Sequence, residues 1–334
     1  MTERSPVGSL PDLLAAVPYL LGFHPADSLV VVGARDRVLC FAARADLPDH
    51  ALGEAASYVT EVCARQPIQW AVLIGYGPAE RVEPPLFALR EAMERHGLPV
   101  PDVLRVTAGR YWSYCCDDPG CCDPAGTPFD PAASPVPAAA TYAGAVALPD
   151  RAALVARLAP VDGQAREVMD RATVRAEERL LALAGPPSLD RRRGWVVLGA
   201  GIAAVRRALE RHTWGVVLTE DEAAWLCVLL RASAVRDAAW RLTRPDPLAH
   251  LGLWVDVVRR AGPSDVAPPA SLVALTAWCL GDGAFAAVAV ERALADDPSY
   301  PLAVLVAEAL RCGLPPSAVD SVGGLVARGA PAVT

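Results

Sequence analysis

The sequence contains no lysine and no asparagine, and all 31 of its basic residues are arginine. Isoleucine is almost as scarce, because it occurs only at Ile68, Ile74 and Ile202. AT-rich codons encode these three residue types, so their scarcity indicates a very GC-rich bacterial genome. The absence of lysine therefore reflects the genome and excludes nothing about function.

The chain also lacks long apolar runs and basic stripes. Its most apolar stretch, 271–290, is interrupted by Gly281-Asp282-Gly283 and falls short of the roughly 18 apolar residues that a membrane helix needs. The first residues lack a basic region and an Ala-x-Ala cleavage site, so we expect no signal peptide. The net charge of −7 argues against binding to nucleic acid, which requires many phosphates to be neutralised. We expect a cytoplasmic protein with reduced thiols that binds neither membranes nor nucleic acid.

The first third of the chain has the alternating pattern of an α/β domain. Apolar residues make up 53% of the chain, and its 334 residues suffice for two domains. Helical and strand patterns follow one another in the order α-β-β-α-β-α-β, and the strands at 28–32 and 37–43 are typical of a hairpin around a turn at 33–36. The sheet is therefore predicted to be mixed, with one antiparallel hairpin and parallel strands joined by crossovers.

We predict that this mixed α/β domain spans 8–149 and ends in a cysteine-rich loop at 115–137. Within that loop, residues 128–137 are rich in proline and are expected to form an extended linker. The segment 141–149 is expected to return one short strand to the sheet.

The remainder, 150–330, is predicted to be an all-helical domain with repeat-like helix hairpins. Thr219 and Glu222 have the spacing of a capping box, which marks the start of one helix. The predicted helices are 151–158, 163–184, 190–212, 220–230, 235–242, 248–260, 271–280, 284–295, 302–312 and 317–327.

One hairpin of this half resembles the second part of a tetratricopeptide repeat. The resemblance rests on the turn Gly281-Asp282, on Ala286, on Ala293-Leu294 and on Asp297-Pro298. Small residues let two helices approach closely, and Pro298 ends the second helix. Because stable arrays need about three units, a single unit implies local hairpin packing and leaves an interaction role open.

A glycine motif in the helical half fits the fingerprint of dinucleotide-binding proteins. Gly199, Gly201 and Ala204 have the required spacing, and Glu220 follows about twenty residues later. However, no strand patterns follow to build a sheet, and the capping box already explains an acidic residue at 220. Apolar residues at helical spacing over 195–211 instead predict one continuous helix.

Several segments together resemble a family of unknown function. They are VPYLLGFHPADSLVVVG, ARADLP, GRYWSYCCDDPGCCDPAGTP, RLAPVDG, VRDAAW and the helical end GDGAFAAVAVERALADDP. These segments are similar to the domain of unknown function 4192 family, found in actinobacteria, over nearly the whole chain. The resemblance implies an actinobacterial cytoplasmic protein without an established activity. The family pattern has one cysteine before the acidic turn, so Cys115 is an additional cysteine here.

The segment YCCDDPGCC holds four of the nine cysteines and is the main candidate site. Structural zinc sites use four ligands, commonly in Cys-x₂₋₄-Cys pairs, and Cys116 and Cys121 form one such pair. Adjacent cysteines seldom bind the same ion, because their side chains tend to diverge, so the loop offers about half a zinc site. The missing ligands would come from a second subunit or from remote residues. The remote candidates are His24, His50 and Cys40.

Two other interpretations of this loop stay open. Cys116 could form a redox pair with Cys121 or Cys122 across the Pro-Gly turn. The neighbouring aspartates would raise the thiol pKa values, which opposes a strongly activated thiolate. Alternatively, the thiols are structural and pack under Trp112 and Tyr114.

Other polar residues are weaker candidates. His24, Asp27 and Ser28 suggest a hydrolase, but Ser28 would begin a strand, whereas a nucleophile elbow needs Gly-x-Ser-x-Gly between strand and helix. Local hydrogen bonds in the turn after Pro25 are the favoured interpretation. Arg44 and Asp46 could flank a cleft, although a surface ion pair is more frequent. Three further candidates lead into the cysteine loop, namely Arg110, Trp112 and Tyr114.

No complete catalytic constellation is evident in the sequence. This favours a non-catalytic binding or regulatory protein that uses its helical half to contact a protein partner or a second copy of itself. The alternative is a metal- or thiol-dependent enzyme or redox sensor centred on Cys116, Cys121 and Cys122, with zinc as the candidate cofactor.

Overall fold

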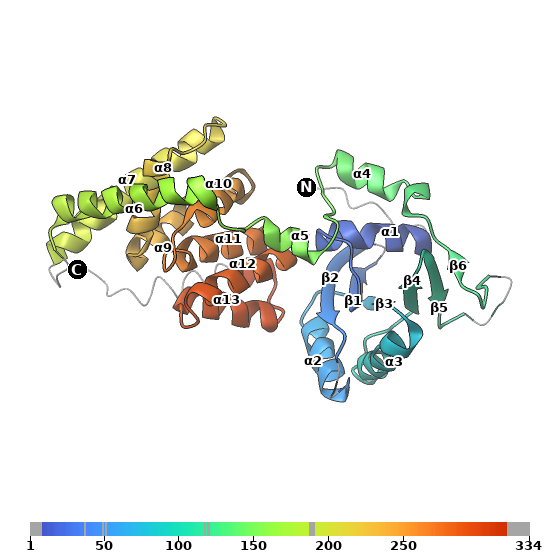
Figure 1. Ribbon diagram of the computed structural model, residues 1–334. Coiled ribbons are helices and arrows are strands. Elements are labelled where there is room, and N and C mark those ends of the chain that lie inside the picture. The colour runs from blue at the N-terminus through green and yellow to red at the C-terminus, as the bar shows by residue number, and fades with distance from the viewer. Residues whose placement is uncertain are drawn as a thin grey trace. The chain divides into compact units, whose positions relative to one another are not determined.

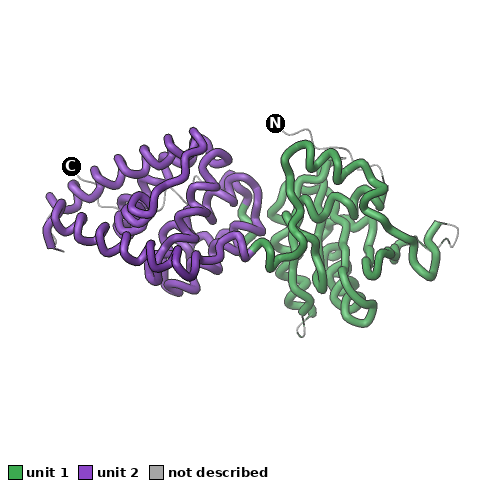
Figure 2. Tube along the Cα trace, turned by 45° about the horizontal axis from the view of Figure 1, so that its top comes forward, with its two compact units in different colours: residues 1–154, 311–314 green, residues 155–310, 315–334 purple. Residues whose placement is uncertain are grey.

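The computed structural model describes residues 9–36, 38–48, 50, 52–116, 118, 121–186 and 191–318. They form two compact units (Figure 2). Unit 1 contains the described residues up to Leu154 together with Arg311–Leu314, and unit 2 contains those from Val155 to Leu310 and from Pro315 onward. The predicted domain limits, 8–149 and 150–330, stay a prediction.

Unit 1 is a mixed six-stranded sheet with helices on both faces (Figure 1). The strand order is β2-β1-β3-β4-β5-β6; β3 and β4 are parallel, and all other neighbouring strands are antiparallel. The strands are β1 Ser28–Arg35, β2 Val38–Asp46, β3 Trp70–Tyr76, β4 Asp102–Thr107, β5 Arg110–Ser113 and β6 Thr127–Pro128. The helices are α1 Leu10–Leu21, α2 Leu52–Ala64, α3 Ala79–Arg95, α4 Val136–Tyr142 and α5 Arg151–Ala156, which continues into unit 2.

The central strands are apolar on both faces because helices cover both sides of the sheet. Leu29 and Val31 of β1 and Leu73 of β3 join the core formed with α2 and α3. Val30 and Ile74, on the opposite face, are fully buried as well, and α1 lies on that side (Figure 1). Continuous apolar strands of this kind are typical of sheets buried on both faces. The predicted mixed α/β fold is confirmed.

The first hairpin is longer than predicted. β1 continues to Arg35 and β2 begins at Val38, with an irregularity in the pairing between Gly33 and Ala34, so the predicted turn at 33–36 is wrong. Gly33 is instead a point of close packing, because a Cβ atom there would lie 2.7 Å from Cγ2 of Ile68.

The predicted linker and return strand are also wrong. Residues 128–137 include the end of β6, a short 3-10 helix at Pro131–Ala133 and the start of α4. The segment 141–149 adds no strand to the sheet among the described residues. Instead, Leu148 forms an isolated bridge with Phe23.

The short segment Arg311–Leu314 is held in unit 1 by side chains of α2 and the residues that follow it. The hydroxyl of Tyr58 donates to the carbonyl of Arg311 at 2.6 Å, and Arg65 donates to the carbonyl of Cys312 at 2.8 Å. These hydrogen bonds satisfy the carbonyl groups of the last residue of a helix, Arg311, and of the residue after it.

Unit 2 is entirely helical in its described part, as predicted. Its helices are α6 Gly163–Ala184, α7 Arg191–Thr213, α8 Glu220–Leu230, α9 Ser233–Thr243, α10 Pro247–Arg260, α11 Ala267–Cys279, α12 Gly283–Asp296 and α13 Pro301–Arg311, whose last residue belongs to unit 1. The predicted helix at 317–327 lies almost wholly outside the described residues, and Pro316–Ala318 form a short 3-10 helix. Within the part of the chain that is described, no helix is both long and apolar enough to cross a membrane.

Two local predictions in unit 2 are confirmed. Thr219 and Glu222 form a reciprocal capping box at the start of α8. The segment 195–211 lies within the single helix α7, so the glycine motif is helical and not a phosphate-binding turn. Gly201 lies so close to α9 that a Cβ atom there would be 2.5 Å from Cγ1 of Val235, whereas a Cβ atom at Gly199 would meet nothing within 4 Å.

The hairpin of α11 and α12 packs through small residues, as its sequence predicts. Ala286 and Ala293 are fully buried, and the Asp282 carboxylate caps α12 by accepting a hydrogen bond from the Phe285 amide at 2.9 Å. The resemblance to a tetratricopeptide unit itself stays a prediction.

Candidate functional site

The cysteine loop is an excursion between two paired strands at one edge of the sheet. β5 pairs with β4 through a tight turn at Ala108-Gly109, where both residues have positive φ angles. β6 then returns the chain beside β5, with Tyr111 opposite Thr127. Neither strand was predicted from the sequence, yet the two strands fix the two ends of the loop.

Trp112 is the main anchor of this loop. Its indole N–H donates to the carbonyl of Pro124 at 3.1 Å, and the guanidinium of Arg105, its partner across the β4–β5 pair, lies 3.6 Å from its ring centroid. Gly126 has a φ of 85°, and a Cβ atom there would lie 2.4 Å from the indole. The guanidinium of Arg110 donates to the Gly126 carbonyl at 2.5 Å. Arg105 was not a candidate in the sequence, although its place in a strand was predicted.

The Tyr114 side chain contacts α3 through a hydrogen bond and through ring packing. Its hydroxyl donates to the Glu83 carboxylate at 2.6 Å and accepts from Nε of Arg105 at 3.1 Å, while its ring meets Phe87 edge-on at 5.1 Å. Burial, reinforced by Glu83, raises the pKa of Tyr114 to about 12. Of the two aromatic residues expected to cover the thiols, Trp112 lines the recess beside them, whereas Tyr114 ties the strand end to α3.

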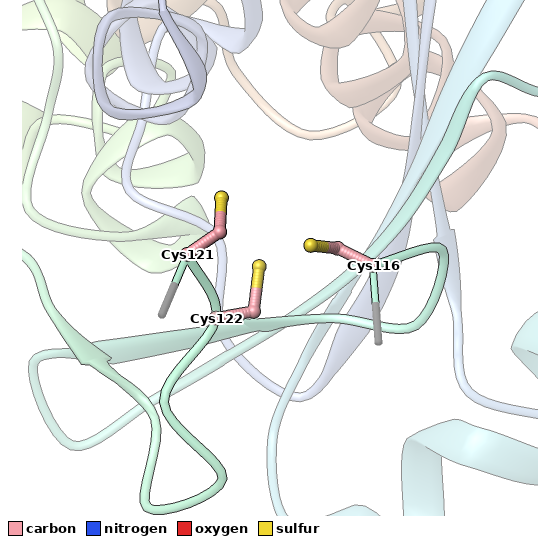
Figure 3. A group of neighbouring side chains, drawn as sticks. All are labelled: Cys116, Cys121 and Cys122. Atoms are coloured by element: carbon pink, nitrogen blue, oxygen red, sulfur yellow. The ribbon is translucent and has the colours of Figure 1, made fainter. Parts of the chain in front are cut away.

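Three of the four clustered cysteines converge (Figure 3). The Sγ atoms of Cys116, Cys121 and Cys122 lie within 4.8 Å of one another. Adjacent cysteines were expected to diverge, and this expectation is wrong for Cys121 and Cys122. A turn brings them together, because the amides of both residues donate to the carbonyl of Asp118, at 3.0 and 2.7 Å.

The residues proposed as remote ligands are not part of this group. Within the described ranges, the group of potential metal ligands consists of the three thiols alone. Cys40 belongs to β2, at the opposite edge of the sheet from β5 and β6. Cys115 is exposed and outside the group, and its interpretation as an additional cysteine stays a prediction.

Hydrogen bonds within the cluster separate the acidities of its thiols. The pKa of Cys116 is lowered because its thiolate accepts a hydrogen bond from the Cys122 thiol and another from the Asp118 amide. The pKa of Cys122, the donor, is correspondingly raised to about 12. The charge of Asp118 raises the pKa of Cys116 as predicted, but the two hydrogen bonds outweigh it, so the pKa of this thiol is lowered and not raised.

His24, Asp27 and Ser28 form no hydrolase constellation in the described structure. His24 is exposed, and its backbone amide donates to the carbonyl of Leu148 at 2.9 Å. Asp27 is exposed, has a φ of 42° and forms a long ion pair with Arg81 at 3.9 Å. Ser28 is fully buried, and its hydroxyl has no hydrogen-bond partner among the described protein atoms. The expected local hydrogen bond of Ser28 is therefore not formed.

Arg44 and Asp46 form the expected ion pair. Nη1 of Arg44 lies 2.5 Å from Oδ1 of Asp46, whose side chain is 85% exposed. An exposed pair of this kind contributes little to stability.

Ser28→Ala should increase the free energy of unfolding of unit 1 by about 1 kcal/mol, because it removes a buried hydroxyl without a protein partner. Urea denaturation of the full chain measures the change. Thr60→Val is the control: the Thr60 hydroxyl is also buried but donates to the Ala56 carbonyl at 2.8 Å, so its removal should destabilise the unit. A loss of stability in Ser28→Ala equal to that in Thr60→Val would contradict the prediction.

Comparison with known proteins assigns the chain to a family but not to an activity. The profile of the family described as "Domain of unknown function (DUF4192)" matches residues 11–317. No curated protein and no solved structure matches the chain. Since the match covers well over half of the chain, including the cysteine loop and helices α2 to α13, the chain belongs to the DUF4192 family.

Proposed function

We propose that Cys116, Cys121 and Cys122 bind one thiophilic metal ion, with zinc as the first candidate, and that the protein is a metal-dependent binding or regulatory protein. The observation that carries this proposal is the convergence of three Sγ atoms within 4.8 Å. Thiolates at about 2.3 Å from a tetrahedral zinc ion stand about 3.8 Å apart. A contraction of roughly 1 Å or less would therefore bring the thiols to zinc-binding distances.

The electrostatics of the loop support a cation. Thiols bind metals as thiolates, and the lowered pKa of Cys116 makes this sulfur the first ligand available. Three thiolates beside Asp118 and Asp123 would repel one another, and a divalent cation offsets that repulsion. Three protein ligands leave the fourth tetrahedral position for water or another donor, as in zinc sites that exchange ligands.

The recess beside the thiols suits an ion better than an organic substrate. It has a volume of about 180 Å³ and is lined by Trp112, Asp123 and Pro124. Small-molecule sites usually occupy about 300–1,000 Å³. A metal would instead close the loop on itself and stabilise the edge formed by β5 and β6.

Metal analysis of the full chain tests this proposal. Protein purified with reductant, stripped with a chelator and reloaded with Zn²⁺ should retain one equivalent. Replacement of any one of the three thiols by serine should weaken zinc binding by at least about 10-fold. Cys115→Ser is the matched control, since Cys115 lies in the same loop but outside the group, and it should retain one equivalent.

Failure of the wild-type protein to bind zinc would overturn the metal proposal. Cys116, Cys121 and Cys122 are not joined in a disulfide in the structure, so thiol counting without reductant distinguishes the redox alternative. Loss of two thiols, with a disulfide from Cys116 to Cys121 or Cys122, would favour a redox switch instead.

A further inference from the structure

Unit 2 contains a cavity that the cysteine site does not explain. It has a volume of about 590 Å³ and lies among α6, α7 and α8. This volume falls within the usual range of small-molecule sites, about 300–1,000 Å³. The cavity belongs to unit 2 alone, so it is independent of the proposed metal site.

Much of the cavity lining is apolar, because small alanine side chains of two helices contribute to it. Ala200, Ala203 and Ala204 share one side of α7 at helical spacing, and Ala182 of α6 also lines the space. Side chains of this size leave room between the helices that larger residues would fill. Trp225 of α8 supplies an aromatic wall.

The charges that line the cavity are unequally neutralised. Asp221 forms an ion pair with Arg175 at 2.5 Å, and Glu222 pairs with Arg211 at 3.2 Å. Both carboxylates are thus neutralised by arginines that do not line the cavity.

The two arginines that do line the cavity form no ion pair with the described carboxylates. Arg179 stacks on Trp225, with its guanidinium carbon 4.3 Å from the ring centroid. Neither Arg179 nor Arg207 forms an ion pair with any carboxylate in the described part of the chain. Among the described residues, the cavity therefore combines an apolar lining with two arginines outside any ion pair.

We propose that this cavity binds an amphipathic anion, namely a small molecule with an apolar chain and a single carboxylate. The chain would lie against the alanines and Trp225, where burial of apolar surface contributes about 25 cal/mol per Å². The carboxylate would accept charge-assisted hydrogen bonds from Arg179 and Arg207, whose planar guanidinium groups match carboxylate geometry.

Calorimetric titration of the full chain with decanoate tests this inference. Decanoate should bind saturably with one molecule per chain, and decyltrimethylammonium, a cation with the same apolar chain, should not. Arg207→Gln should weaken decanoate binding by at least about 10-fold, the effect of losing one charge-assisted contact. Arg206→Gln is the matched control, because Arg206 is its neighbour on α7, is exposed like Arg207, and does not line the cavity.

Ala204→Leu provides a second test that leaves both arginines in place. It should fill the apolar part of the cavity and abolish decanoate binding, while circular dichroism confirms that the variant is folded. Equal decanoate affinity in Arg207→Gln and Arg206→Gln would overturn the proposal, as would equal binding of the cationic analogue. Binding to vesicles of anionic phospholipid without binding of free decanoate would also overturn it, since it would indicate a membrane surface site.

Discussion

Gly201→Ala should lower the free energy of unfolding of unit 2 by about 2 kcal/mol, whereas Gly199→Ala should raise it by about 0.5–1 kcal/mol. Both glycines lie in α7, two residues apart. A Cβ atom at position 201 would lie 2.5 Å and 2.6 Å from the two Cγ atoms of Val235, so α7 and α9 would have to separate. At position 201 the cost of overpacking outweighs the gain in helix propensity. At position 199 only the gain in helix propensity applies, because a Cβ atom there meets nothing within 4 Å.

Urea denaturation followed by circular dichroism measures both effects, with the two compact units fitted as separate transitions. The pair also tests the dinucleotide interpretation of the motif. If these glycines approached a pyrophosphate, both substitutions would weaken nucleotide binding. Neither would then destabilise unit 2 through a clash with α9. Destabilisation of equal size at both positions would contradict the packing explanation.

Arg231→Met should destabilise unit 2 by about 3–5 kcal/mol, because it leaves a buried carboxylate without its cation. The Asp265 side chain is only 4% exposed. It accepts hydrogen bonds from Nε and Nη2 of Arg231, at 2.6 and 2.8 Å. This two-point contact joins the end of α8 to the segment that precedes α11.

Arg175→Met is the control for this prediction. The ion pair of Arg175 with Asp221 is equally short, but both of its side chains are more than half exposed, so its loss should cost less than about 1 kcal/mol. Chemical denaturation of the two variants under the same conditions makes the comparison. A similarly small loss of unfolding free energy in both variants would show that burial of Asp265 does not set the contribution of its ion pair to stability.

The sequence was most informative where structure is local. α6 and α8 have the predicted bounds, and the capping box of α8 is formed by the predicted residues. Local hydrogen bonds and helical periodicity decide such elements, and both can be read along the chain. β5 and β6 were not predicted, because strands of four and two residues show almost no periodic pattern in the sequence. They exist through pairing with strands that are already in place.

The sequence could not distinguish the structural roles of its glycines. Gly33 resembles a turn residue and Gly201 resembles part of a nucleotide motif, yet both permit close approach of another element, to Ile68 and Val235 respectively. Which neighbour approaches a glycine is decided by packing between segments distant in the chain.

For the candidate site, too, the sequence and the tertiary structure supplied different information. The sequence alone singled out Cys116, Cys121 and Cys122 as the candidate thiols, set Cys115 aside as an additional cysteine, and placed their loop after a strand of a mixed sheet. Only the tertiary structure decided that two adjacent cysteines converge with the third, because the carbonyl of Asp118 accepts both of their amides and the anchors at Trp112 and Arg110 hold the loop ends. It also decided that His24 and Cys40 stay apart from these thiols, since strand order is fixed by long-range pairing and burial.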